Sequence, residues 1–280
     1  MIGIENDRIL VTMDYKNHLQ VLANRFTTFA CSFDTREKNK KFAWGLALIH
    51  DKSGKDTYTS NSATFSFAKN IQISKKNKAV MAIQAGCVQK YIDVNKLTWN
   101  NQFDGTGFDM NLPSGENSDA NYFIPDISAG SVWETEFGNG KEMRAGIAAH
   151  HLTNPVLKAN NIASIAIGWN VSGMATLPID NSLMSIQPSF LFSKQAMDEW
   201  LERWQGVPRQ RGFNARYTPD RDASYLSAGV FLKTNNALIF AAGISFDEQM
   251  SFTFSYDIGT RQNLQGKSGG LEFSVNYSIR

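Results

Sequence analysis

The sequence lacks the residues that usually define a disulfide framework or a thiolate metal centre. Only two cysteines, Cys31 and Cys87, occur among 280 residues, too few for either kind of site. We interpret them as single apolar fillers, with pairing in an oxidising compartment as the alternative. Prolines number only seven, and no Ser/Pro-rich or Gly/Ser-rich linker divides the chain. We therefore expect a single domain over residues 1–280.

Long apolar runs and a strong charge of one sign are also missing. No run of eighteen or more apolar residues exists, which excludes a transmembrane helix. The formal net charge is +2, so there is no signal for nucleic acid or another charged polymer as partner. The start, "MIGIENDRIL", lacks the charged-then-apolar profile of a signal peptide. Aromatic residues, by contrast, are abundant at 12% of the chain.

The clearest positive signal is alternation with a period of two. In "MSFTFSYDI", Met250, Phe252 and Phe254 fall on one side while the serines and threonine between them fall on the other. The segments "LEFSVNYSI" and "FAWGLALI" repeat this pattern. Successive side chains of a strand point to opposite faces, so each segment is predicted to be a half-buried strand.

Applied to the whole chain, the alternation predicts about fourteen strands. Their ranges are 8–16, 25–34, 42–51, 57–68, 79–91, 124–134, 143–151, 161–173, 183–193, 209–217, 223–233, 237–246, 250–258 and 268–279. Many are longer than the usual strand of a globular sheet and match the roughly 9–11 residues that cross a bilayer when tilted. We predict an all-β, antiparallel transmembrane β-barrel, with 12 or 16 strands and a soluble β-sandwich as alternatives.

The predicted connections differ between the two ends of this barrel. The two longest, 92–123 and 194–208, both follow odd-numbered strands and therefore lie at the same end. Membrane barrels have short turns at one end and long loops at the other. With both termini in the periplasm, the long loops face the cell exterior. The predicted location is the outer membrane, crossed many times.

The two faces of the predicted strands suit lipid and an aqueous lumen respectively. Phe, Leu, Ile, Trp and Tyr occupy one face. Ser, Thr, Asn and Gly occupy the other, together with scattered charges. A charge in lipid is costly, so these charges are expected to point inward and to pair there. The charges in question are Asp14, Asp34, Arg144, Asp257 and Glu272.

The exterior loop 92–123 contains "LTWNNQFDGTGFDMNLPSGEN". We expect a structured loop that folds over or into the barrel mouth, with Trp99, Phe103 and Phe108 as anchors and candidate partner-binding residues. An alternative is a Ca²⁺ site, because oxygen ligands in a Gly-bearing loop can bind this ion. Its candidate ligands are Asp104, Asp109, Asn111 and Glu116. They lack the spacing of a known calcium loop, and turns use Asp and Gly in any case; no metal or other cofactor is therefore predicted.

The loop 194–208 is predicted to hold a short helix, because four apolar residues follow helical spacing. These are Met197, Trp200, Leu201 and Trp204. Exposed tryptophans on such a helix suit a partner-binding anchor. The same residues are compatible with contact with the lipid surface or with a plug in the barrel.

The remaining polar motifs do not predict an enzyme. His150 and His151 end a strand, and adjacent strand residues point to opposite faces, so they are not expected to share one site. No spacing nominates a nucleophile for a hydrolase; a rim histidine bonded near Asn154 and Pro155 is the simpler interpretation. Basic segments at 36–41 and 69–78, with Lys141, fall at the periplasmic end, as solvated turns or as contacts for an acidic partner or for lipid head groups.

Several motifs together resemble the PorP/SprF family of outer-membrane proteins, which belong to the type IX secretion and gliding machinery of Bacteroidetes. They are "NNQFDGTGFDMNLPSGEN", "YFIPDISAGSVWETEF", "MRAGIAAHHLTNP" and the closing strands, with Ser255, Tyr256, Asp257, Gly269, Gly270 and Glu272. The resemblance covers the chain from about Arg8 onward. It implies a non-enzymatic barrel that docks or anchors a secreted cell-surface adhesin, or that binds periplasmic ring lipoproteins of the motor. The alternative function is transport of small hydrophobic solutes, which a barrel of this size has room for.

Overall fold

The computed structural model describes most of the chain. The described residues are 9–19, 26–36, 41–53, 57–93, 96–109, 111–113, 115, 120–157, 163–195, 209–218, 224–233, 237–247, 249–259 and 269–279. Within these ranges, no helix has the length or apolar character needed to cross a membrane.

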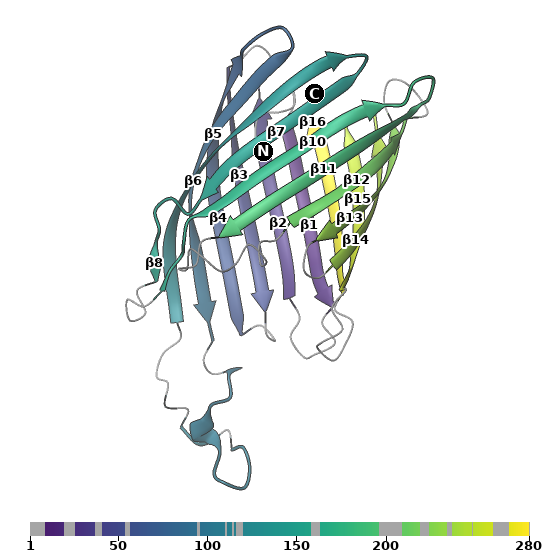
Figure 1. Cartoon of the computed structure of the whole chain (residues 1–280). Coiled ribbons are helices and arrows are strands. Elements are labelled where there is room, and N and C mark those ends of the chain that lie inside the picture. Colours follow the sequence, from purple (N-terminus) through teal and green to yellow (C-terminus); the bar gives the residue numbers. More distant parts are fainter. Residues whose placement is uncertain are drawn as a thin grey trace, which may run out of the picture.

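The chain forms a closed antiparallel barrel of fourteen strands, which confirms the predicted fold (Figure 1). Closure occurs where β1 pairs with both β2 and β16. Every strand of the barrel thereby has two neighbours, so the barrel sheet has no free edge. The barrel strands are β1 (Ile9–Leu19), β2 (Phe26–Arg36), β3 (Phe42–Ser53), β4 (Tyr58–Gln72), β5 (Asn77–Ile92), β6 (Ala120–Gly138), β7 (Lys141–His150), β10 (Gly168–Pro178), β11 (Met184–Gln195), β12 (Arg209–Tyr217), β13 (Tyr225–Lys233), β14 (Ala237–Phe246), β15 (Met250–Gly259) and β16 (Gly269–Ile279). A separate two-stranded sheet pairs β8 (Val156–Leu157) with β9 (Ala163–Ser164), and η2 (Asn100–Gln102) lies between β5 and β6.

The connections confirm the predicted asymmetry of the two ends. Tight turns join strands at one end, for example Asn139 and Gly140, which both have positive φ between β6 and β7. The longest connections, 93–119, 151–167 and 196–208, all lie at the other end. We call these the short-turn end and the long-loop end.

One strand begins later than predicted. The sequence predicts a strand from residue 161, whereas β10 begins at Gly168. Ile165 and Ile167 continue the alternation of Trp169, which hides the boundary in the sequence. The boundary is set by β7, because Gly168 pairs with His150, the last residue of that strand. Residues before Gly168 therefore have no β7 neighbour to pair with.

Large apolar side chains point away from the barrel axis, toward the space that the bilayer occupies. Three cross-strand aromatic contacts line the outer face near the short-turn end. Phe42 stacks on Phe67 with ring centroids 5.4 Å apart, and Trp44 lies 5.4 Å from Phe33 and 6.4 Å from Phe65. Both cysteines are free, and the strand register places them on this outer face, as the filler interpretation predicts. Among the described residues few apolar side chains are buried, and Ala43, Ala68 and Val80 form one cluster.

Candidate functional site

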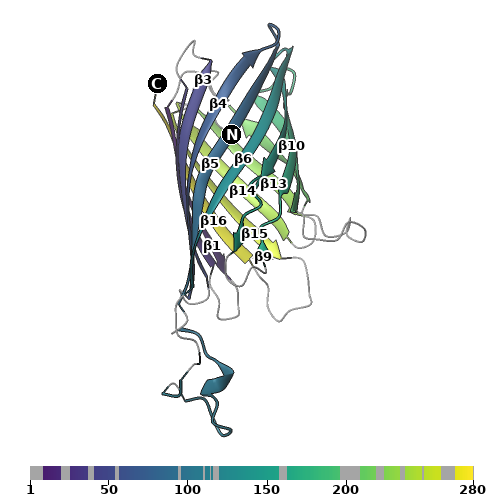
Figure 2. The same cartoon turned by 90° about the vertical axis from the view of Figure 1, so that its left-hand side faces the viewer.

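The loop between β5 and β6 projects beyond the barrel at the long-loop end (Figures 1 and 2). This corrects the prediction that it folds over or into the barrel mouth. We call residues 96–115 of it the projecting loop. Phe103 and Phe108, two predicted partner-binding residues, form an isolated β-bridge within it. Their side chains are 57% and 46% exposed, while Trp99 is half-buried.

Hydrogen bonds within the projecting loop explain why it needs no support from the barrel mouth. The side chain of Gln102 is buried, an unusual position for an amide in an exposed loop. Its Oε1 accepts from the Trp99 backbone N–H at 3.1 Å, and its Nε2 donates to the Leu112 carbonyl at 3.2 Å. The Asp109 N–H donates to the Gln102 carbonyl at 2.8 Å. Gln102 thus ties the two sides of the loop together.

Two carboxylates of the projecting loop stabilise its turns. Oδ1 of Asp104 accepts from the Thr106 N–H at 2.7 Å, the Thr106 hydroxyl at 2.7 Å and the Gly107 N–H at 2.8 Å. These donors favour the charged form and lower the pKa of Asp104 below its ordinary value. Oδ1 of Asp109 accepts from the N–H and the side-chain amide of Asn111, both at 2.9 Å. These contacts are those of Asx turns, the simpler interpretation of the sequence.

Five other predicted site residues fall outside the part of the chain that the structure describes. Glu116, the fourth candidate calcium ligand, lies outside the described residues, as do Met197, Trp200, Leu201 and Trp204 of the predicted loop helix. In the part of the chain that the structure describes, no three His, Cys, Asp or Glu side chains gather as a metal-ion site would require.

The lumen is lined by polar side chains that pair across strands. Oε2 of Glu272 accepts from the Lys16 ammonium at 2.8 Å, and Asp14 accepts from the Ser274 hydroxyl. Arg144 Nε lies 3.0 Å from Glu134, whose other oxygen lies 2.6 Å from Lys78. Asp14, Arg144 and Glu272 therefore point inward and pair as predicted, while the pairing partners Lys16, Lys78 and Glu134 were not identified in the sequence. Alternation signals an inward side chain but not its neighbour on the next strand.

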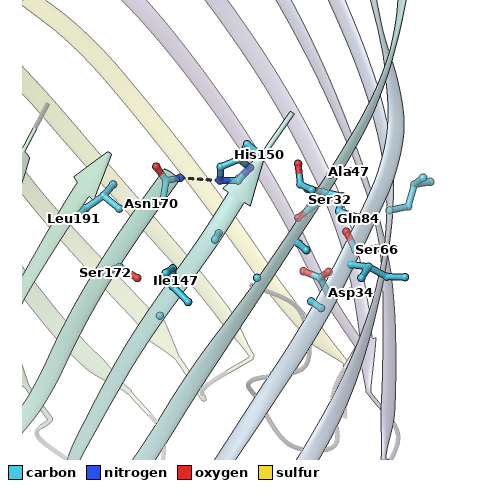
Figure 3. A pocket seen from close by; sticks show the side chains of 18 residues that line it. Ser32, Asp34, Ala47, Ser66, Gln84, Ile147, His150, Asn170, Ser172 and Leu191 are labelled. Carbon is cyan, nitrogen blue, oxygen red and sulfur yellow. Dashed lines mark hydrogen bonds between the residues drawn. The ribbon is translucent and has the colours of Figure 1, made fainter. Parts of the chain in front are cut away.

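A cavity of about 430 Å³ lies in this lumen and is walled by strands from β2 to β11 (Figure 3). Hydroxyl, amide, carboxylate and imidazole groups face it. They include Ser32, Asp34, Ser66, Gln84, Asn170 and His150. On one side, the Asn170 amide nitrogen lies 2.8 Å from Nε2 of His150. The cavity therefore has a mixed lining, with donors and acceptors on several strands among apolar groups such as Ala47, Ala82 and Ala148.

His150 and His151 lie closer together than predicted. Their ring centroids are 6.5 Å apart, because His151 has a φ of 58° and no longer follows the strand alternation. Nδ1 of His151 lies 3.0 Å from Asp126, which points inward from β6. The premise of the prediction, that the two side chains point to opposite faces, is wrong for this reason, although the rings have different partners, Asn170 for His150 and Asp126 for His151. The expected bond near Asn154 exists through the backbone, since the Asn154 N–H donates to the His151 carbonyl at 2.9 Å.

The predicted basic segments lie at the short-turn end. Lys69, Lys75, Lys76 and Lys141 are exposed there, whereas residues 37–40 lie outside the described residues. Two large apolar side chains, Ile73 and Phe137, are each 61% exposed at the same end. This end therefore also presents a surface with basic and apolar groups.

The closed sheet, the apolar outer face and the polar lumen define an outer-membrane β-barrel. The structure is similar to the Pseudomonas putida toluene transporter TodX at 10% identity, with a TM-score of 0.56 over 99% of this chain and 90% of that chain. It is also similar to CdiB from Acinetobacter baumannii at 9% identity, with a TM-score of 0.56 over 99% of this chain and 60% of that chain. At these identities the likeness shows the fold alone.

The sequence identifies the family within this class. The chain belongs to the type IX secretion system membrane protein PorP/SprF family, whose profile matches residues 1–277. No curated protein matches the chain. The family and the fold are those of a membrane barrel and secretion component, not of a known class of enzyme.

Proposed function

We propose that this barrel docks or anchors a secreted cell-surface adhesin for the type IX secretion and gliding machinery, with the projecting loop as the contact. The main support is the structure of the loop. Hydrogen bonds within the loop hold it together, and Phe103 and Phe108 are exposed on it. Exposed aromatic side chains on a pre-organised loop suit a binding surface, because little conformational freedom is lost on contact. The proposal places the long-loop end at the cell exterior.

Binding of the periplasmic ring lipoproteins is the other branch of the proposal. Its contact would be at the short-turn end, where Ile73, Phe137 and the exposed lysines lie. The two branches require opposite ends of the barrel, so variants at each end separate them.

Transport of small hydrophobic solutes has less support. A fold shared with the toluene transporter TodX leaves this function open, and the cavity in the present barrel has a mixed lining in which Asp34, Gln84 and Asn170 lie among apolar residues. An apolar solute in this cavity would cover the carboxylate and the two amides without giving them hydrogen bonds, which is costly.

The test is a tagged pull-down from gently solubilised outer membranes, with bound proteins identified by mass spectrometry. Three barrels are compared: wild type, Phe103→Ser/Phe108→Ser and Ile73→Ser/Phe137→Ser. The two variants remove similarly exposed apolar pairs from opposite ends, so each is the control for the other.

We expect the wild-type barrel to capture a large secreted protein that only the loop variant loses. Loss of ring lipoproteins with the Ile73 and Phe137 variant alone would favour the periplasmic branch. Recovery of the barrel alone in several detergents would contradict both branches and favour solute transport.

A further inference from the structure

Four polar side chains form a hydrogen-bonded row on the outer face of the barrel, where lipid is expected. Nδ1 of His50 lies 2.6 Å from Oδ1 of Asn61, whose Nδ2 donates to Oε1 of Gln89 at 3.4 Å. Nε2 of Gln89 donates in turn to Oδ1 of Asn121 at 3.1 Å. The row thus crosses β3, β4, β5 and β6, and we call it the outer polar row.

The strand register places the outer polar row on the lipid side. His50 pairs with Phe29 and Asn61, and Asn61 pairs with Gln89. Directly paired residues share one face of a sheet, and Phe29 is 47% exposed on the outer face. Polar side chains on this face need an explanation, since lipid offers them no hydrogen bonds.

The height of the row on the barrel supplies part of that explanation. His50, Asn61 and Gln89 each lie three residues from the long-loop end of their strand. Apolar outward residues follow toward the other end, such as Leu48 on β3, Phe65 on β4 and Ile83 on β5. The row therefore lies where the hydrocarbon belt gives way to the head-group region. Figure 2 shows this wall, with β5 and β6 toward the viewer.

A groove of about 330 Å³ opens beside the row on the same face. His50, Asn61 and Gln89 supply its polar side, and the apolar side includes Phe29, Leu48 and Phe123. Phe123 is 69% exposed. Among the described residues that line the groove, none is Asp, Glu, Lys or Arg. A ligand here would meet apolar walls and neutral hydrogen-bonding groups.

The outer polar row has hydrogen-bond donors and acceptors that its own bonds do not use. Because Oδ1 of Asn61 only accepts, Nδ1 of His50 carries the donated proton, and Nε2 of the neutral ring remains an acceptor. Within the bonds of the row, the amides of Asn61 and Gln89 each use one of their two N–H groups, and the amide of Asn121 uses neither. The row can therefore both donate to and accept from a ligand, as a hydroxyl or an amide group requires.

We infer that the groove binds the head group of an uncharged glycolipid in the leaflet at the long-loop end. Hydroxyl and amide groups of the sugar would bond to His50, Asn61 and Gln89, while an acyl chain would lie against Leu48 and Phe123. The location within the bilayer favours lipid over a protein partner, because the row lies within the strands, on the membrane side of the projecting loop. This inference goes beyond the docking role and does not depend on it.

The test measures lipid binding by native mass spectrometry on the whole barrel in a detergent without a sugar head group. Two probes with identical acyl chains are compared, monoglucosyl-dioleoylglycerol and dioleoylglycerol. The variant is Asn61→Leu/Gln89→Leu. Its matched control is Gln187→Leu/Asn214→Leu, which removes a hydrogen-bonded Asn–Gln pair from the lumen, where Asn214 donates to Gln187 at 3.4 Å.

Wild type and the lumen control are expected to bind the glucosyl lipid on the order of tenfold more tightly than dioleoylglycerol, because about two net hydrogen bonds are gained. The row variant is expected to bind the two lipids equally. Heat-modifiable gel migration checks folding, and Gln89→Met replaces the double variant if that variant does not fold. Equal binding of the two lipids by wild type, or a preference retained in the row variant, would overturn the inference. A second result would also overturn it: wild type shows no lipid preference, and a protein that co-purifies with wild type is lost from the row variant. The groove would then be assigned to that protein.

Discussion

At the residue scale, the lumen is organised by charges whose partners come from neighbouring strands. Glu134 holds Lys78 and Arg144 from the two strands beside it and is the most enclosed of the three, with its side chain 9% exposed against 25% and 35%. Lys16 and Glu272 form a second pair with both partners about a third exposed. Removing the charge of one partner of an enclosed ion pair is costly, because the other partner keeps an uncompensated charge.

We predict that Glu134→Gln destabilises the barrel by about 1–3 kcal/mol, less than for a fully buried pair because both cations are partly hydrated. Glu272→Gln is the control and should cost less than about 1 kcal/mol. Reversible unfolding in urea from lipid vesicles, followed by tryptophan fluorescence, measures both. Equal losses for the two variants would show that enclosure of Glu134 has no energetic consequence.

The projecting loop is predicted to loosen in acid. The pKa of Asp104 is lowered in the folded loop by donors from Thr106 and Gly107. A carboxyl with a lowered folded pKa stabilises the fold fully above its unfolded pKa, and this contribution disappears as the pH falls through the folded pKa. Amide hydrogen exchange at Thr106 and Gly107, corrected for intrinsic rates, should therefore accelerate as the pH falls below 3.8, the ordinary pKa of an aspartate. Asp104→Asn should remove this pH dependence; an unchanged profile would contradict the role given to the carboxylate.

At the scale of single elements, the contact between β4 and β5 depends on a glycine. Gly86 pairs with Thr64, and an added Cβ would lie 2.2 Å from the Ala63 carbonyl oxygen and 2.8 Å from the Thr64 Cα. Both atoms belong to the backbone and cannot rotate away. The two strands therefore pack at a distance that only glycine permits at this position.

Gly86→Ala is expected to destabilise the barrel by about 1–3 kcal/mol, the usual cost of forcing extra volume into a packed site. Gly107→Ala is the matched control, since an added Cβ there would meet nothing within 4 Å. The fraction of heat-modifiable, folded barrel after refolding into vesicles compares the two. Normal folding of the Gly86 variant would mean that β4 and β5 separate without cost.

The elements also show what a single sequence reveals and what it does not. Alternation predicted every barrel strand, because lipid on one side and a polar lumen on the other impose a period of two. It misplaced the start of β10, since that boundary depends on where β7 ends. It also failed for His151, whose positive φ breaks the alternation. The direction of the projecting loop depends on internal bonds such as those of Gln102, which no periodicity encodes.

At the scale of the whole molecule, pairing between strands creates features that no strand has alone. The outer polar row is an example, because His50, Asn61, Gln89 and Asn121 become neighbours only through the register of four strands. The closed barrel separates three environments: a polar lumen, an apolar belt and two unlike ends. The docking role requires the projecting loop at the long-loop end to reach the cell exterior, where Phe103 and Phe108 would meet a secreted protein.

Site-specific photocrosslinking in living cells tests that requirement most directly. A photoreactive phenylalanine analogue replaces Phe103, and the control places it at Phe67, on the outer face of β4, where Phe42 stacks on it. The docking role predicts an adduct with a large secreted surface protein from position 103 and none from position 67. Adducts with periplasmic lipoproteins alone, or no adduct above the level at position 67, would contradict it.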